Sequence, residues 1–196
     1  MTGPTNTDNT YSVDQFMTDA REAYARLGST AAGREQLGSL LQRLARTPGL
    51  IPEQSLEALH GGEAAATVLA SDGPEGLTLM MARFTTPTSV HDHGTWGVAC
   101  VVQGRDRYQK WARLDGGDTG NTQDQDLSHV AVRLDEEREL GPGEIIAWSG
   151  PPQDLHAQQG VDGPVWELVL FGQNVMVLPR HYFDPISGNV RTILPQ

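Results

Sequence analysis

Cysteine is almost absent from the chain, which holds a single one, Cys100, among 196 residues. One cysteine cannot form a disulfide within the chain, so a disulfide-bonded secreted scaffold is excluded and a reducing compartment is favoured. No apolar segment stands ahead of a cleavage site near the N-terminus, and no apolar run approaches the length of a membrane span. We therefore expect a cytoplasmic protein that does not act at a membrane.

Basic residues are also scarce. Lys and Arg number 14 against 25 Asp and Glu, which gives a formal net charge of −11. A protein that binds nucleic acid needs a basic surface to neutralise phosphates, and no basic cluster occurs in the sequence. A nucleic-acid partner is therefore excluded, while the acidic excess favours solubility without identifying any chemistry.

The residues that are present divide the chain into two parts, of which the first is helical. The polar segment 1–10 has the composition of a disordered leader. Apolar residues then recur with a helical period over 12–28 and over 31–47, and 52–62 could add a short helix. We expect these segments to form a helical layer over 11–60.

The second part, 65–196, consists of short apolar or alternating runs separated by Gly, Pro, Asp and Asn. This rhythm is typical of an antiparallel sandwich or barrel. The polar stretch 112–129 is too acidic for a core, and we interpret it as a long hairpin loop that could serve as a lid. The predicted fold is mainly β, with N-terminal α-helices, in a single domain over 11–196.

Two of the six histidines, His91 and His93, stand one residue apart in "HDHGTWGVACVVQG". On a strand, residues i and i+2 share a face, so both imidazoles would point one way and Asp92 the other. His156, which opens a later predicted strand, is the best candidate for a third ligand. Three neutral imidazoles on one face of a metal leave positions open for substrate and oxygen. The alternative is an edge strand whose two histidines face solvent.

The same stretch resembles the first motif of the cupin superfamily, and within it the thiol dioxygenases, the family of cysteine and 3-mercaptopropionate dioxygenases. Gly97 stands where other cupins carry a Glu ligand, so the resemblance implies a metal set of His91, His93 and His156. It also implies a cupin double-stranded β-helix (jelly-roll) barrel and a mononuclear non-heme iron(II) cofactor, Fe(2+). The implied reaction is the addition of O2 to a small thiol to give a sulfinate.

The resemblance also supplies two candidate catalytic residues, Arg180 and Glu167. Arg180 stands where mercaptopropionate-type enzymes place the Arg that binds the substrate carboxylate, a role that suits a planar guanidinium. A salt bridge at the rim is the alternative. Glu167, Val169 and Phe171 replace the Ser, His and Tyr that the family carries after the third ligand. Glu167 could be a base, a substrate contact or a fourth ligand, or it could face solvent if Trp166 and its alternates point inward.

The loss of that polar triad makes the predicted pocket more apolar, which favours a bulkier or less polar substrate. Two alternatives therefore stay open beside a thiol dioxygenase: a cupin oxygenase that acts on carbon of a bulkier specialised metabolite, and a non-catalytic metal-binding cupin. We expect a small-molecule substrate and O2 as partners, and a monomer or homodimer. Trp96 and Trp148 line the pocket mouth or pack in the core. His60, His129 and His181 are interpreted as ordinary histidines, with His181 as the first candidate for an exception.

Overall fold

The computed structural model describes residues 11–49, 64–115 and 127–194. The leader predicted at 1–10 and the short helix proposed at 52–62 lie outside these ranges. The described helices are α1 (Val13–Leu27) and α2 (Ala31–Ala45), with a 3-10 turn at Val175–Val177. The described strands are β1 (Ala64–Ser71), β2 (Thr78–Phe84), β3 (Val90–His91), β4 (Gly97–Gln103), β5 (Asp106–Arg113), β6 (Val132–Leu140), β7 (Ile145–Trp148), β8 (His156–Gly160), β9 (Val165–Phe171), β10 (Arg180–Phe183) and β11 (Val190–Ile193).

Each helix begins at a capping side chain. The Ser12 hydroxyl accepts a hydrogen bond from the backbone N–H of Gln15, and the Thr30 hydroxyl accepts one from that of Gly33. These bonds satisfy amide groups that have no partner within the helix. The helix α2 ends at Ala45, two residues before the predicted end. Neither described helix is long and apolar enough to cross a membrane.

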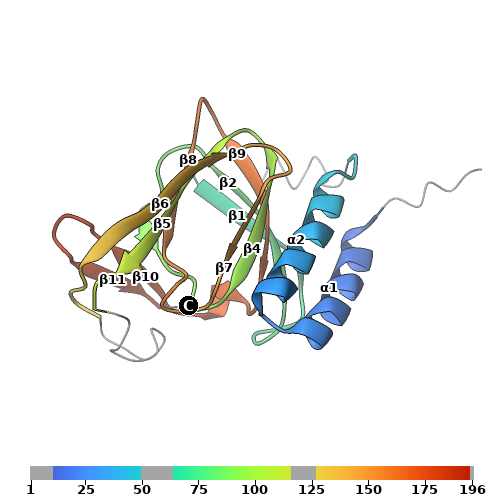
Figure 1. Ribbon diagram of the computed structural model, residues 1–196, viewed down its shortest axis with the longest axis horizontal. Coiled ribbons are helices and arrows are strands. Elements are labelled where there is room, and N and C mark those ends of the chain that lie inside the picture. The colour runs from blue at the N-terminus through green and yellow to red at the C-terminus, as the bar shows by residue number, and fades with distance from the viewer. Residues whose placement is uncertain (1–10, 50–63, 116–126, 195–196) are drawn as a thin grey trace, which may run out of the picture.

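The strands form two antiparallel sheets that face each other. One sheet has the order β1-β2-β9-β4-β7 and the other the order β11-β10-β3-β8-β5-β6, so neighbouring strands are often distant in the sequence. This interleaving is the pattern of a jelly roll. The helices α1 and α2 pack together outside the first sheet, where α2 lies against β4 and β7 and α1 contacts β1 (Figure 1). The predicted mainly β fold with N-terminal helices is confirmed.

The segment predicted as a long hairpin loop, 112–129, connects two strands that do pair. β5 and β6 are antiparallel neighbours, with Arg113 opposite Val132. The strand β5 therefore extends two residues into the predicted loop, because Ala112 and Arg113 pair with Arg133 and Val132. The centre of the predicted loop, 116–126, lies outside the described residues.

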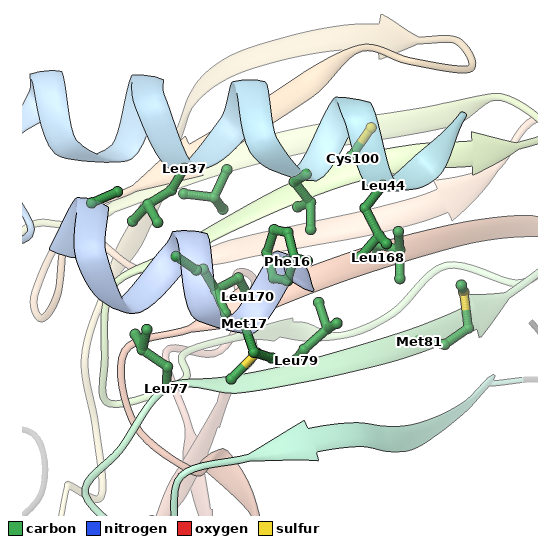
Figure 2. Packing of buried hydrophobic residues seen from close by; sticks show 14 of the residues in the cluster. Phe16, Met17, Leu37, Leu44, Leu77, Leu79, Met81, Cys100, Leu168 and Leu170 are labelled. Carbon is green, nitrogen blue, oxygen red and sulfur yellow. The ribbon is translucent and has the colours of Figure 1, made fainter. Parts of the chain in front are cut away.

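The strand β9 is buried on both faces. Leu168 and Leu170 pack against Phe16 of α1 in the layer between the first sheet and the helices, as Figure 2 shows. Val169 and Phe171, which alternate with them, belong to a second cluster between the two sheets. Strand alternation thus assigns neighbouring residues of one apolar run to two different cores.

Candidate metal centre

Three histidines meet inside the barrel. His91 ends β3 and lies directly opposite His156, the first residue of the neighbouring strand β8. His93 follows beyond the end of β3, so the prediction that both histidines lie on one strand holds for His91 alone. Nevertheless the Nε2 atoms of His93 and His156 are 3.2 Å apart. One nitrogen from each of the three rings can be chosen so that all lie within 4.8 Å of one another.

The three imidazoles are neutral at pH 7. Burial, together with the positive charge of Arg180, lowers the pKa of His91 to about 4. Burial likewise holds the pKa values of His93 and His156 well below the usual range. A neutral imidazole keeps a lone pair, which is the form that binds a metal.

Backbone carbonyl groups orient two of the rings. The Nδ1 atom of His91 lies 2.9 Å from the carbonyl oxygen of Ser89, and Nδ1 of His156 lies 3.1 Å from that of Asp154. A carbonyl only accepts, so each Nδ1 carries the proton and each Nε2 offers its lone pair. Metal–nitrogen bonds of about 2.0–2.1 Å place ligand nitrogens roughly 3–3.4 Å apart, which the His93–His156 spacing matches. The donor set therefore fits a divalent transition metal.

Two buried carboxylates hold the backbone around these rings. Asp154 accepts hydrogen bonds from the N–H groups of His93 and Gly94 at 3.0 and 2.9 Å. Asp92 points away from the ligands and binds His181, at 2.8 Å to its N–H and 2.7 Å to Nδ1. The role of His181, which was interpreted as ordinary, becomes visible only through this contact.

The space beside Gly97 is filled by an indole ring. A Cβ atom at Gly97 would lie 2.2 Å from the ring of Trp148, so no larger residue fits there without displacing the indole. The same ring stacks on His93, with 5.7 Å between centroids. Trp148 therefore stands where a fourth side-chain ligand at 97 would have to pass. Trp96, in contrast, packs on Tyr24 of α1 at 5.2 Å and belongs to the helix-facing core.

The histidines open onto a cavity of about 330 Å³. This volume lies at the lower end of the range for small-molecule sites. Glu167, Val169 and Phe171 all line the cavity, and Glu167 is 1% exposed, so the alternative in which Glu167 faces solvent is wrong. The remaining wall is largely apolar, and Tyr182 stacks on His91 with 5.9 Å between centroids.

Arg180 lies in the cavity wall at the start of β10. Its Nη2 atom is 3.0 Å from Nδ1 of His93. Among the described residues it forms no ion pair with a carboxylate, in contrast to the rim salt bridge considered as its alternative role. A guanidinium only donates, so Nδ1 of His93 accepts here and the ring proton resides on Nε2. If Nε2 of His93 binds a metal, the ring proton must move to Nδ1, which then no longer accepts from Arg180. Ligation through Nε2 therefore requires the contact between Arg180 and His93 to be released.

Glu167 has two polar neighbours that the sequence did not identify, Gln158 and Asp106. The side-chain amide of Gln158 donates to both carboxylates, at 2.9 Å each. Gln158 lies two residues after His156 on β8, so its position on the same face as a proposed ligand was the signal available in the sequence. Asp106 comes from β5, and nothing in its local sequence indicates that it reaches this cluster.

No protein-family model matches the chain, and no curated protein sequence matches it. Solved structures similar to it include a cupin-superfamily protein from Desulfitobacterium hafniense, with 15% identity over 62% of this chain and 87% of that one and a TM-score of 0.40. An oxalate oxidase has 16% identity over 58% of this chain and a TM-score of 0.40, and the DMSP lyase DddQ from Ruegeria pomeroyi has 16% over 67% and 0.37. The chain spans about half the length of these two proteins, 52% and 51%.

These distant similarities assign the chain to no family. Two facing antiparallel sheets with the strand order given above, covered on one side by two helices, form a jelly roll. Three buried histidines inside it could hold a metal ion.

Proposed function

We propose that the protein is a mononuclear non-heme iron(II)-dependent dioxygenase of thiol-dioxygenase type, acting on a small thiol that carries a carboxylate. Both oxygen atoms of O2 end on the sulfur, so the thiol is oxidised to a sulfinate by four electrons and O2 is reduced by four. The observation that carries this proposal is the convergence of three neutral imidazoles on a cavity whose wall also holds Arg180. The choice of iron and of sulfur rests on the resemblance of the "HDHGTWGVACVVQG" motif to that family.

His91, His93 and His156 would hold the iron through Nε2, which is directed by backbone carbonyl groups in two of the three rings. When bound, iron(II) supplies the redox chemistry that joins a thiol to O2. Gly97 and the adjacent indole of Trp148 add no fourth ligand. The chain thus leaves one side of the metal position to the two reactants.

Arg180 would bind the substrate carboxylate by two parallel hydrogen bonds once released from His93. Its positive charge on the cavity wall also favours the thiolate over the thiol, since a nearby cation lowers a thiol pKa. Val169, Phe171 and Trp148 exclude water from the same space, which strengthens both effects. These residues orient the substrate and hold its sulfur deprotonated.

An oxygenase acting on carbon is the second candidate. It is favoured by the apolar side chains of Val169 and Phe171, which stand where thiol dioxygenases carry a His and a Tyr. A non-catalytic metal-binding cupin would use the same three histidines without consuming oxygen.

Oxygen uptake by the anaerobically iron-loaded protein separates these functions. We expect uptake with 3-mercaptopropionate or a related carboxylate thiol, one sulfinate formed per O2 consumed, and loss of both in His156→Ala. The product is identified by mass spectrometry with labelled O2. Bound iron without uptake in the presence of any thiol would contradict thiol dioxygenation, and uptake with a thiol-free compound would favour carbon chemistry.

A further inference from the structure

A chain of hydrogen bonds joins Arg180 to two of the proposed ligands. Nη2 of Arg180 lies 3.0 Å from Nδ1 of His93, and Nε2 of His93 lies 3.2 Å from Nε2 of His156. Nδ1 of His156 in turn lies 3.1 Å from the carbonyl oxygen of Asp154. The chain therefore runs from the cavity wall, through both rings, to the backbone at the start of β8.

The two ends of this chain determine where its protons lie. A guanidinium only donates and a carbonyl oxygen only accepts, so Nδ1 of His93 accepts while Nδ1 of His156 donates. A neutral imidazole carries one proton, which therefore lies on Nε2 of His93 and on Nδ1 of His156. In the contact between the rings, the Nε2–H of His93 thus donates to Nε2 of His156. The two nitrogens that face the metal position are joined by a hydrogen bond.

His93 differs in this respect from the other two proposed ligands. In His91 and His156 the Nδ1 atom lies 2.9 and 3.1 Å from a backbone carbonyl oxygen, so Nε2 has the lone pair that a metal needs. In His93 the Nδ1 atom faces a cation instead. Ligation through Nε2 moves the ring proton to Nδ1, where an N–H would meet an N–H of Arg180. Two donors cannot share a hydrogen bond, so the contact and the ligation exclude each other.

The packing around His93 indicates which partner moves. Trp148 stacks on the ring with 5.7 Å between centroids, Phe171 packs on it at 4.8 Å, and the residue is 8% exposed. The ring is thus held in its plane. Arg180 is only partly buried, lines the cavity and forms no ion pair with a carboxylate in the described part of the chain. The guanidinium is therefore the group that must leave when His93 becomes a ligand.

We propose that Arg180 competes with the metal for His93, and that a carboxylate bound by Arg180 relieves this competition and strengthens metal binding. Both ligands need the same change, which is the release of Nδ1 of His93 by the guanidinium. Each ligand therefore favours the other by the same factor, because coupling between two binding sites is reciprocal. This inference rests on the proposed function for the carboxylate at Arg180, and it adds a coupling between that carboxylate and the metal.

The zinc affinity of the full-length protein, measured by competition with a chromogenic chelator, tests this coupling. The probe is propionate, which keeps the carboxylate of 3-mercaptopropionate without its sulfur, and propionamide is the uncharged control of similar shape. We expect saturating propionate to raise the zinc affinity about tenfold, a usual size for coupling between two sites, and propionamide to leave it unchanged. Calorimetry of propionate binding with and without zinc should give the same factor.

Two matched variants separate this coupling from direct binding of propionate to zinc. In Arg180→Met the effect of propionate on zinc affinity should disappear. In Arg133→Met, which removes the same charge from an exposed position on β6, the effect should remain. An equal rise of zinc affinity in the wild type and in Arg180→Met would show that propionate binds the zinc itself, and would overturn the proposal.

The position of the ring proton of His93 gives a second readout. Attraction between propionate and zinc across the cavity needs no particular tautomer, whereas competition for His93 needs the proton on Nε2. Nitrogen NMR of ring-labelled histidine, on protein freed of metal by a chelator, distinguishes the two tautomers, and His93→Gln identifies the signals. We expect the proton on Nε2 of His93 in the wild type. A proton on Nδ1 would overturn the competition even where propionate raises the zinc affinity.

The coupling and the proposed function fail in different ways. None of these measurements uses a thiol or oxygen, so a zinc affinity that propionate leaves unchanged overturns the coupling while thiol dioxygenation stands. If propionate raises the zinc affinity but the iron-loaded protein takes up no oxygen with any thiol, the proposed function is overturned and the coupling stands. Wild-type protein that binds no zinc at all would overturn both.

Discussion

The two faces of strand β9 have the same burial but different chemistry. Leu168 and Leu170 meet the helices and complete a layer of apolar side chains (Figure 2). Glu167 and Val169, one residue away on the other face, line a cavity, and Oε1 of Glu167 has no hydrogen-bond partner in the part of the chain that the structure describes. Polar groups inside a protein cost stability unless they are paired, so their presence on one face alone distinguishes the functional side of the sheet from the structural side.

Truncating neighbouring residues of β9 should separate the two faces most strongly. Leu168→Ala opens a cavity in a fully packed core, and we expect it to lower the free energy of unfolding by about 3 kcal/mol. Val169→Ala enlarges a cavity that already exists, so its expected cost is about 1 kcal/mol. Urea denaturation measures both. Equal costs would contradict the distinction between the faces.

The backbone support of the metal position should matter for metal affinity more than for folding. Asp92→Asn weakens the bond to His181 that fixes the chain between His91 and His93. We expect a 10- to 100-fold loss of zinc affinity, the range found for partners that orient metal ligands. Competition with a chromogenic chelator measures it. Glu136→Gln, an exposed carboxylate on β6, is the control and should leave the affinity unchanged.

The buried cluster of Glu167, Gln158 and Asp106 should make the free energy of unfolding depend on pH. The pKa of Glu167 is raised in the folded protein, so its contribution to stability is complete below the unfolded value of about 4.5 and is lost as pH rises toward the folded value. Glu167→Gln does not titrate. Relative to wild type, this variant should therefore gain up to about 1.4 kcal/mol per pH unit above pH 5. Parallel stability curves for the two proteins between pH 5 and 7 would show that Glu167 is ionised in the fold.

Arg180→Met should affect the substrate and not the metal. Removing the guanidinium eliminates the proposed carboxylate contact, and we expect about a tenfold weaker affinity for 3-mercaptopropionate. Zinc affinity should stay the same or increase, because the contact between Arg180 and Nδ1 of His93 no longer competes with ligation through Nε2. A loss of zinc affinity in Arg180→Met would show that the guanidinium supports the histidine instead.

Much of the fold could be predicted from local patterns. The start of α1 follows from the Ser12 cap and helical periodicity, and the mainly β character of the rest follows from short runs between turn residues. The gathering of His91, His93 and His156 was anticipated from the paired histidines and the resemblance they carry. The helix start and the strand rhythm depend on neighbouring residues, which the sequence displays directly. The distant His156 was joined to the histidine pair by its place at the start of a predicted strand and by the resemblance.

The rest depends on contacts between distant segments. The run "VWELVLF" is apolar on both faces, so alternation alone could not decide whether Glu167 or Trp166 faces the cavity. The filling of the space at Gly97 by Trp148 depends on the register between β4 and β7. Likewise, Asp106 reaches Gln158 only because β5 pairs with β8. Such pairings are set by tertiary packing and leave no local signal.

The central claim is that His91, His93 and His156 together bind one metal ion beside the cavity. Anaerobic iron(II) titration tests it most directly, with the wild type compared to His91→Ala, His93→Ala and His156→Ala. We predict one iron per wild-type chain and a loss of affinity of at least about 100-fold in each variant, with folding checked by circular dichroism. A folded variant that binds iron as tightly as the wild type would contradict the three-histidine site.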